Sequence, residues 1–305
     1  MTSARTILVA TDLSAPARHA VERAFLLAAS SGSELCILHA MELDALDSLR
    51  EMWGDDVSAV KAALNSDARK HLDELTSAAA IRRGVAARTC IAEGKPLNAI
   101  AAEADALDAR LVVIGARGES PLRHTVLGPT AARLLRKSSQ RPVLVVKNEP
   151  HATYGCVLVA VDFSPVSLEA VRLARRWAPK ADLVLLHAFE LPYEGKLRLA
   201  GVDAQEIRRY VTSSSENRRE RLHELAATAG LAPAEYLVRV IHGDPAQQII
   251  GVAQELASDL IVIGKHGSHL VEEFLLGSVT KHVLAESRCD VLVICDPRDA
   301  PDESP

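Results

Sequence analysis

The sequence predicts an α/β protein made of two copies of one domain, each built on a doubly wound parallel sheet. Three observations predict this fold class. Five sequence blocks recur in one order, each block is a short apolar run rich in Val, Ile and Leu, and helical patterns separate the blocks. Continuous apolar runs are typical of strands buried on both faces. Aromatic residues make up only 3% of the chain, so the predicted core is aliphatic.

The repeat extends over most of the 305 residues at an offset of 148 to 150 residues. Five blocks in one order at so constant an offset cannot plausibly arise by chance. The blocks are ILVATDLS (7–14), LCILHAMEL (35–43), EGKPLNAI (93–100), LVVIGARG (111–118) and VLVV (143–146), which return as VLVAVDFS (157–164), LVLLHAFEL (183–191), HGDPAQQI (242–249), LIVIGKHG (260–267) and VLVI (291–294).

The repeat sets the predicted domain boundaries. An N-terminal domain spans 1–147, a polar linker follows at 148–155, and a C-terminal domain spans 156–295. The last segment, 296–305, is acidic and rich in Pro, a composition that predicts disorder.

Helical patterns alternate with the strands in the order βαβαβαβαβ in each half. Ala-rich periodic segments at 16–30 and 165–178 follow the first strand of each half. Longer amphipathic segments at about 55–83 and 203–229 follow the second strand. Right-handed crossovers between parallel strands then favour a doubly wound sheet, in which ligands bind beyond the carboxyl ends of the strands.

Gly and Pro mark where several of these helices end or begin. Gly84 and Gly230 come directly after the long amphipathic segments and are predicted helix stops. Pro96 and Pro245 fit the first position of a helix, where the missing N–H costs little.

Composition argues against several classes of protein. The formal net charge of −5, from 35 basic and 40 acidic residues, lacks the basic surplus of a nucleic-acid-binding protein. No segment approaches the roughly 18 apolar residues of a membrane helix, and the first residues lack the apolar stretch of a signal peptide. The five scattered cysteines form no CxxC or Cys/His cluster. We therefore expect a cytoplasmic protein with reduced thiols and no metal site.

The second half carries the sharpest functional pattern, Gly-x-x-Gly-x9-Gly-Ser over 264–278. The first part follows a predicted strand, and the final Gly-Ser opens a predicted helix. Glycines let backbone amides approach a ligand, and a helix N-terminus presents free N–H groups with the positive end of its dipole. The pattern predicts a phosphate cradle, although a glycine-bearing loop with a Ser helix cap has the same sequence. It matches neither a Walker A loop nor the dinucleotide-binding glycine pattern.

For the other polar residues near predicted strand ends, ligand-binding roles compete with structural ones. Asp162, repeated as Asp12, accepts from a ribose hydroxyl, holds a cation near phosphates, or caps the next helix. His39 and His187 end apolar strands and are expected to be satisfied core residues. The cations on the two glycine loops are either solvated or counter-charges for phosphate, namely Arg117, Arg123, His124 and Lys265. His266 and His269 have no nearby third ligand, which argues against a metal site.

Taken together, these segments resemble the universal stress protein family in its tandem two-domain form. The resemblance covers nearly all of residues 5–295. It is carried by VAVDFSPVS (159–167), LLHAFE (185–190), HGDP (242–245) and the glycine pattern. It implies a strand order of 3-2-1-4-5, a nucleotide pocket between strands 1 and 4, ATP as the ligand with Mg²⁺ left open, and a role in stress survival.

The resemblance also implies how the two halves associate. Family members usually pair through their last strands, so 143–146 would meet 291–294 in an intramolecular pseudo-dimer. A further homodimer through the long helices stays open, and protein partners are not predicted.

The residues at the family's nucleotide-binding positions differ between the halves. In the first half Pro129 stands where the second half has Ser278, which removes a hydroxyl and an N–H donor. Losing a donor to a charged phosphate costs about 1.5–3 kcal/mol, so the first site is predicted to be weak or empty. The implied binding residues are Ala160, Asp162, Ala188, Gly264, His266, Gly267, Gly277, Ser278 and Val279 in the second half, and Asp12, Ala40, Gly115, Gly118, Gly128 and Thr130 in the vestigial first site.

The sequence therefore favours an ATP-binding, cytoplasmic regulator or sensor of the stress response, with nucleotide held mainly in the second half. Two alternatives remain. One is a nucleotide-free scaffold for protein contacts. The other is a slow ATPase or phosphate- or adenylate-transferring enzyme with His266 as the first catalytic candidate. Binding is favoured over turnover because no nucleophile elbow or acid/base pair is evident.

Overall fold

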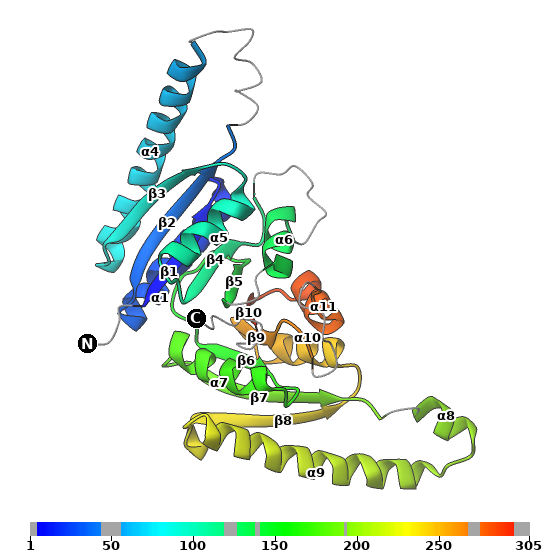
Figure 1. Ribbon diagram of the computed structural model, residues 1–305. Helices are drawn as coiled ribbons and strands as arrows, with labels where there is room; N and C mark the ends of the chain where they lie inside the picture. Colours follow the sequence, from blue (N-terminus) through cyan, green and yellow to red (C-terminus); the bar gives the residue numbers. More distant parts are fainter. Residues whose placement is uncertain are drawn as a thin grey trace, which may run out of the picture. The chain divides into compact units, whose positions relative to one another are not determined.

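The computed structural model describes residues 5–43, 56–118, 127–137, 141–191, 194–267 and 275–295 (Figure 1). The chain divides into two compact units, Met1–Thr153 and Tyr154–Pro305, and each unit is described by itself. The predicted disordered tail at 296–305 lies outside the described residues.

The first unit is a five-stranded parallel sheet with the order β3-β2-β1-β4-β5. Helices join its successive strands, as Figure 1 shows. The elements are β1 (Thr6–Thr11), α1 (Ala15–Ser31), β2 (Glu34–Met41), α4 (Asp56–Arg83), β3 (Ala87–Glu93), α5 (Pro96–Ala106), β4 (Leu111–Gly115), α6 (Pro129–Lys137) and β5 (Val143–Val146).

The second unit repeats this architecture, with the sheet order β8-β7-β6-β9-β10 and parallel pairs throughout. A short helix, α8, and a 3-10 turn, η1, are additions to the predicted order. The elements are β6 (Cys156–Ala160), α7 (Pro165–Trp177), β7 (Asp182–Phe189), α8 (Glu194–Leu199), α9 (Ala204–Thr228), η1 (Pro233–Glu235), β8 (Tyr236–His242), α10 (Pro245–Glu255), β9 (Leu260–Gly264), α11 (Ser278–Glu286) and β10 (Asp290–Ile294).

Both units thus have the predicted α/β fold and the strand order 3-2-1-4-5. The predicted pairing of 143–146 with 291–294 stays a prediction. In the described part of the chain, no helix combines the length and the apolar character needed to cross a membrane.

Local signals fix the ends of the helices as expected. Gly84 and Gly230 follow α4 and α9 with φ angles of +67° and +87°, a conformation that side chains with a Cβ disfavour. Pro96 and Pro245 are the first residues of α5 and α10. Ser14 caps α1, because its hydroxyl accepts from the Ala17 N–H at 3.3 Å.

The central strands form the core of each unit. Ile7, Leu8 and Val9 in β1 are fully buried, as is the segment 157–159 in β6. Burying one such side chain stabilises a fold by about 1.5–3 kcal/mol relative to leaving it in water. Buried aliphatic side chains therefore form the core of each unit, as the low aromatic content predicted.

Polar contacts, one of them buried, hold the amino end of the second sheet. The Tyr154 hydroxyl donates to Asp290 Oδ2 at 2.8 Å, and both side chains are buried. Asp259 Oδ2 accepts from the backbone N–H groups of Gly155 and Cys156 at 2.7 and 3.0 Å. These bonds hold the chain as it enters β6, the central strand.

We expect Tyr154→Phe to lower the stability of the second unit by about 1–3 kcal/mol, because it removes one donor from a buried carboxyl group. The measurement is guanidinium unfolding followed by the fluorescence of Trp177, which is buried in this unit. A Trp53→Phe background removes the chain's second tryptophan. Tyr210→Phe is the control because Tyr210 is 55% exposed. Equal unfolding midpoints for the two variants would contradict the expectation.

Candidate functional site

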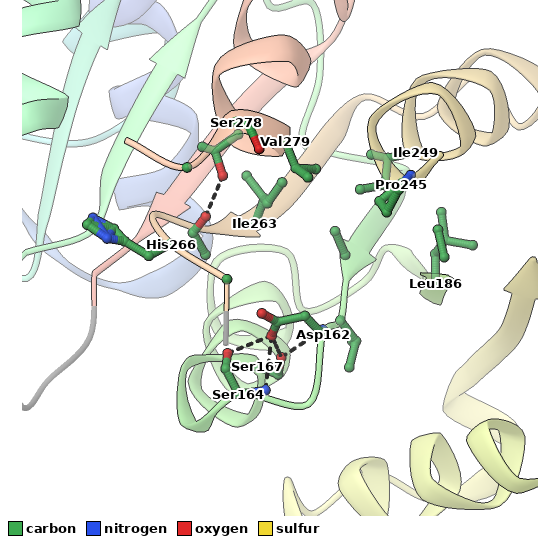
Figure 2. Close-up of a pocket in the computed structure, with 17 residues that line it drawn as sticks. Asp162, Ser164, Ser167, Leu186, Pro245, Ile249, Ile263, His266, Ser278 and Val279 are labelled. Atoms are coloured by element: carbon green, nitrogen blue, oxygen red, sulfur yellow. Dashed lines mark hydrogen bonds between the residues drawn. The ribbon is translucent and has the colours of Figure 1, made fainter. Parts of the chain in front are cut away.

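A pocket of about 460 Å³ lies at the carboxyl ends of the central strands of the second unit (Figure 2). β6 and β9 pair in parallel, with Val157 opposite Leu260 and Val159 opposite Val262, so the segments that follow them meet at one edge. The end of β7 and the starts of α10 and α11 complete the walls. All nine residues predicted for this half line the pocket: Ala160, Asp162, Ala188, Gly264, His266, Gly267, Gly277, Ser278 and Val279.

One wall of the pocket is apolar. It consists of Leu186 from β7, Pro245 and Ile249 from α10, and Ile263 from β9. Figure 2 shows Pro245 and Ile249 away from the polar group around Asp162. An apolar wall with polar groups on other sides is the usual make-up of a small-molecule site.

Two glycines of the loop, Gly264 and Gly277, lie where a side chain would be crowded. A Cβ on Gly264 would lie 3.1 Å from the His266 carbonyl oxygen, and one on Gly277 would lie 3.2 Å from the Lys265 carbonyl oxygen. The Gly277 N–H donates to that same Lys265 oxygen at 2.9 Å, which joins the two parts of the loop. The bare backbone therefore forms the floor of the pocket.

Helix α11 begins at the pocket and has no side-chain cap among the described residues. The first N–H groups of an α-helix have no partner within the helix. Ser278 and Val279 begin this helix and line the pocket. Their N–H groups, the Ser278 hydroxyl and the positive end of the helix dipole make this edge suited to an anion.

Thr280 also lines the pocket and holds the glycine loop by a hydrogen bond. Its hydroxyl donates to the Gly264 carbonyl oxygen at 2.7 Å, and the side chain is buried. The bond ties the end of β9 to the first turn of α11. The position of the loop therefore depends on a side chain that the sequence motif does not include.

Asp162 is not the helix cap, because Ser164 is the N-cap residue of α7 and no side chain caps that helix among the described residues. One carboxylate oxygen of Asp162 instead fixes the turn before α7, and the other lies toward the pocket. Oδ1 accepts from the Ser164 N–H at 3.0 Å, the Ser164 hydroxyl at 2.6 Å and the Ser167 hydroxyl at 2.8 Å. Oδ2 faces Gly267, where an added Cβ would lie 3.5 Å away. The structural role of Asp162 is thus to hold this turn, and that role leaves Oδ2 compatible with a ligand contact.

His187 and His39 both have hydrogen-bond partners, as expected, but only His187 is buried; His39 is half-buried. The ring Nδ1 of His187 lies 2.7 Å from the Val161 carbonyl oxygen, and that of His39 lies 2.9 Å from the Thr11 oxygen. A carbonyl only accepts, so Nδ1 donates in both cases. Burial lowers the pKa of His187 below its usual value, which favours the neutral ring.

The first unit has a pocket of about 310 Å³ in the corresponding place. Pro129 is the first residue of α6 and supplies no N–H group there. A Cβ on Gly118 would collide with Asp12 Oδ2, so this carboxylate crowds the loop. All six residues predicted for the vestigial site line this pocket: Asp12, Ala40, Gly115, Gly118, Gly128 and Thr130.

Of the positively charged residues predicted for the glycine loops, Lys265 is not placed as expected. Lys265 is 1% exposed and does not line the pocket, so it is neither a solvated charge nor a phosphate contact in this structure. Its N–H bonds the Ile294 carbonyl oxygen at 2.7 Å, which continues the sheet past Gly264 and holds this residue in the interior. Arg117 is exposed and lines the first pocket. Arg123, His124 and His269 lie outside the described residues.

Several pocket residues were not predicted as site residues, and two of them, Ser167 and Thr280, hold the site through hydrogen bonds. Neither belongs to the glycine pattern. The signal that distinguishes them is the internal repeat, because Ala17 and Ala131 occupy the corresponding positions in the first unit. Each unit therefore serves as a comparison for the other.

Comparison with known proteins gives one consistent family. The model of the universal stress protein family matches residues 3–147 and 153–294. Universal stress protein Rv2005c of Mycobacterium tuberculosis is 30% identical over 193 residues, which cover 61% of this chain and 62% of that protein. The match thus spans about three fifths of the relative's length.

A solved structure that covers nearly the whole chain shows the same fold. A universal stress protein from Archaeoglobus fulgidus has a TM-score of 0.71 at 21% identity, covering 97% of this chain and 99% of that chain. A universal stress protein in complex with cAMP is 26% identical and covers 47% of this chain and 98% of that chain, with a TM-score of 0.33.

We expect Thr280→Val to loosen the cradle, because the Gly264 carbonyl loses its hydroxyl donor while the side chain keeps its shape. The second unit should lose about 0.5–1.5 kcal/mol of stability. Hydrogen-exchange mass spectrometry should show faster exchange in peptides that cover 260–267. Thr130→Val, at an exposed position of the first unit, is the matched control. Exchange at the wild-type rate in Thr280→Val would show that the bond does not hold the loop.

Proposed function

This chain belongs to the universal stress protein family, and from that premise we propose that it binds an adenine nucleotide, ATP foremost, mainly in its second unit. Nucleotide occupancy would make it a regulator or sensor of the stress response. The observation that carries the proposal is the uncapped start of α11 beside the bare glycine loop, opposite the Asp162 carboxylate.

Each part of the pocket suits one part of the nucleotide. The apolar wall around Pro245 and Ile249 suits the face of a purine. Asp162 Oδ2 is placed to accept from ribose hydroxyls or to face a cation such as Mg²⁺. The N–H groups at Ser278 and Val279 suit the phosphates. The volume of about 460 Å³ falls within the usual range for small-molecule sites.

The polar groups of the pocket support binding more than turnover. Asp162 is the carboxylate in the pocket lining, and its Oδ1 already accepts three hydrogen bonds. A nucleotide would therefore act by stabilising one arrangement of the loop and helix start. No disulfide joins the five cysteines, all of which lie within the described residues. A location in the reducing cytoplasm is part of this proposal.

Ser278→Pro tests the anion-binding role of the helix start. Proline fits the first position of a helix, and Pro129 occupies that position in α6, so the fold should survive. The variant loses an N–H and a hydroxyl, and we expect ATP affinity to fall by about 1.5–3 kcal/mol, which is at least about tenfold. Isothermal titration calorimetry measures the change.

Ser278→Ala is the graded control, since it removes the hydroxyl and keeps the N–H. Its affinity for ATP should lie between those of the wild-type protein and Ser278→Pro. Far-ultraviolet circular dichroism checks that all three proteins are folded. Wild-type affinity in Ser278→Pro, or a wild-type chain that takes up no adenine nucleotide, would contradict the proposed function.

A further inference from the structure

Ser167 holds Asp162 at two points. It is the third residue of α7, and its side chain is only 3% exposed. Its hydroxyl accepts from the Asp162 N–H at 3.1 Å and donates to Asp162 Oδ1 at 2.8 Å (Figure 2). One buried hydroxyl thus fixes both the backbone and the carboxylate of the residue that faces the glycine loop.

These contacts determine which carboxylate oxygen remains open. The terminal torsion of an Asp side chain is broad, so the two oxygens exchange places unless hydrogen bonds restrain them. Here three donors converge on Oδ1, two from Ser164 and one from Ser167. Oδ2 stays directed to the space beside Gly267 and lines the pocket as an acceptor.

The first unit shows the arrangement without this hydroxyl. Ala17 replaces Ser167; Asp12 Oδ1 still accepts from the Ser14 N–H at 3.1 Å, and the Ser14 hydroxyl accepts from the Ala17 N–H. Asp12 is exposed, whereas Asp162 is half-buried. Asp12 Oδ2 sits so close to Gly118 that an added Cβ would collide with it, while the matching Cβ on Gly267 would be at ordinary contact distance.

We propose that Ser167 is a positioning residue that keeps Asp162 Oδ2 available to the ribose hydroxyls of the bound nucleotide, and that Ala17 impairs the first site independently of Pro129. The inference rests on the proposed function. Its physical basis is preorganisation, because a carboxylate already fixed in the binding geometry has less freedom to lose when the ligand arrives.

The loss-of-function test compares ATP with 2′,3′-dideoxy-ATP in Ser167→Ala, by isothermal titration calorimetry. Wild type should prefer ATP, since only ATP offers ribose hydroxyls to Asp162. The variant should bind ATP about tenfold more weakly, while its affinity for dideoxy-ATP should hardly change. The preference for ATP over dideoxy-ATP should therefore be lost. General damage to the fold would weaken both ligands together. Ser258→Ala, at another buried serine of this unit, should keep the wild-type preference.

The gain-of-function test cannot be imitated by a folding defect. Pro129→Ser restores the donors at the start of α6 but leaves Ala17 in place. Ala17→Ser combined with Pro129→Ser restores both features of the second unit. Native mass spectrometry with ATP should show a second bound nucleotide in the double variant at concentrations where Pro129→Ser alone shows one.

Each outcome bears on a separate claim. An unchanged preference for ATP in Ser167→Ala would overturn the positioning role while leaving the proposed function standing. A second nucleotide in Pro129→Ser alone would overturn the role assigned to Ala17. A wild-type chain that binds neither ligand would overturn the proposed function and this inference with it.

Discussion

Parallel pairing between β6 and β9 is the constraint on which the candidate site depends. Two strands, β7 and β8, separate them in the sequence, yet they are neighbours in the sheet. The crossover brings the segment after Ala160 and the segment after Gly264 to the same edge, where the sheet order changes direction. The start of α11, reached through Gly277, then closes the pocket. Asp162 and the glycine loop face each other for this reason.

The two units separate what the fold requires from what the site requires. Both have the same sheet order and fully buried central strands, although few residues outside the repeated blocks are identical. Aliphatic packing tolerates exchanges of similar volume, whereas a hydrogen bond is lost with a single atom. Pro129, Ala17 and Ala131 are all compatible with the fold, and each removes a polar group that the second unit has. A fold can thus persist in one repeat after its ligand contacts have changed.

Much of this architecture could be predicted from the sequence because its signals are local or repeated. Buried strands, the glycines after α4 and α9, and the paired glycine loops all have such signals. The hydrogen bond of Thr280 could not be predicted, because it joins the start of α11 to the end of β9, and their relative placement exists only in the folded chain. Ser167 is only five residues from Asp162, but the sequence does not show that its hydroxyl turns back to the carboxylate. The burial of Lys265 was missed for the same reason: a lysine on a loop gives no local sign that the sheet continues past it.

The central claim is that one repeat keeps a nucleotide site and the other has lost it. The most direct measurement is native mass spectrometry of the unaltered chain during titration with ATP, which counts bound nucleotides per chain. The account predicts saturation at one nucleotide per chain. Two nucleotides bound with equal affinity would contradict the asymmetry between the units, and the absence of any bound nucleotide would contradict the assignment of the second pocket.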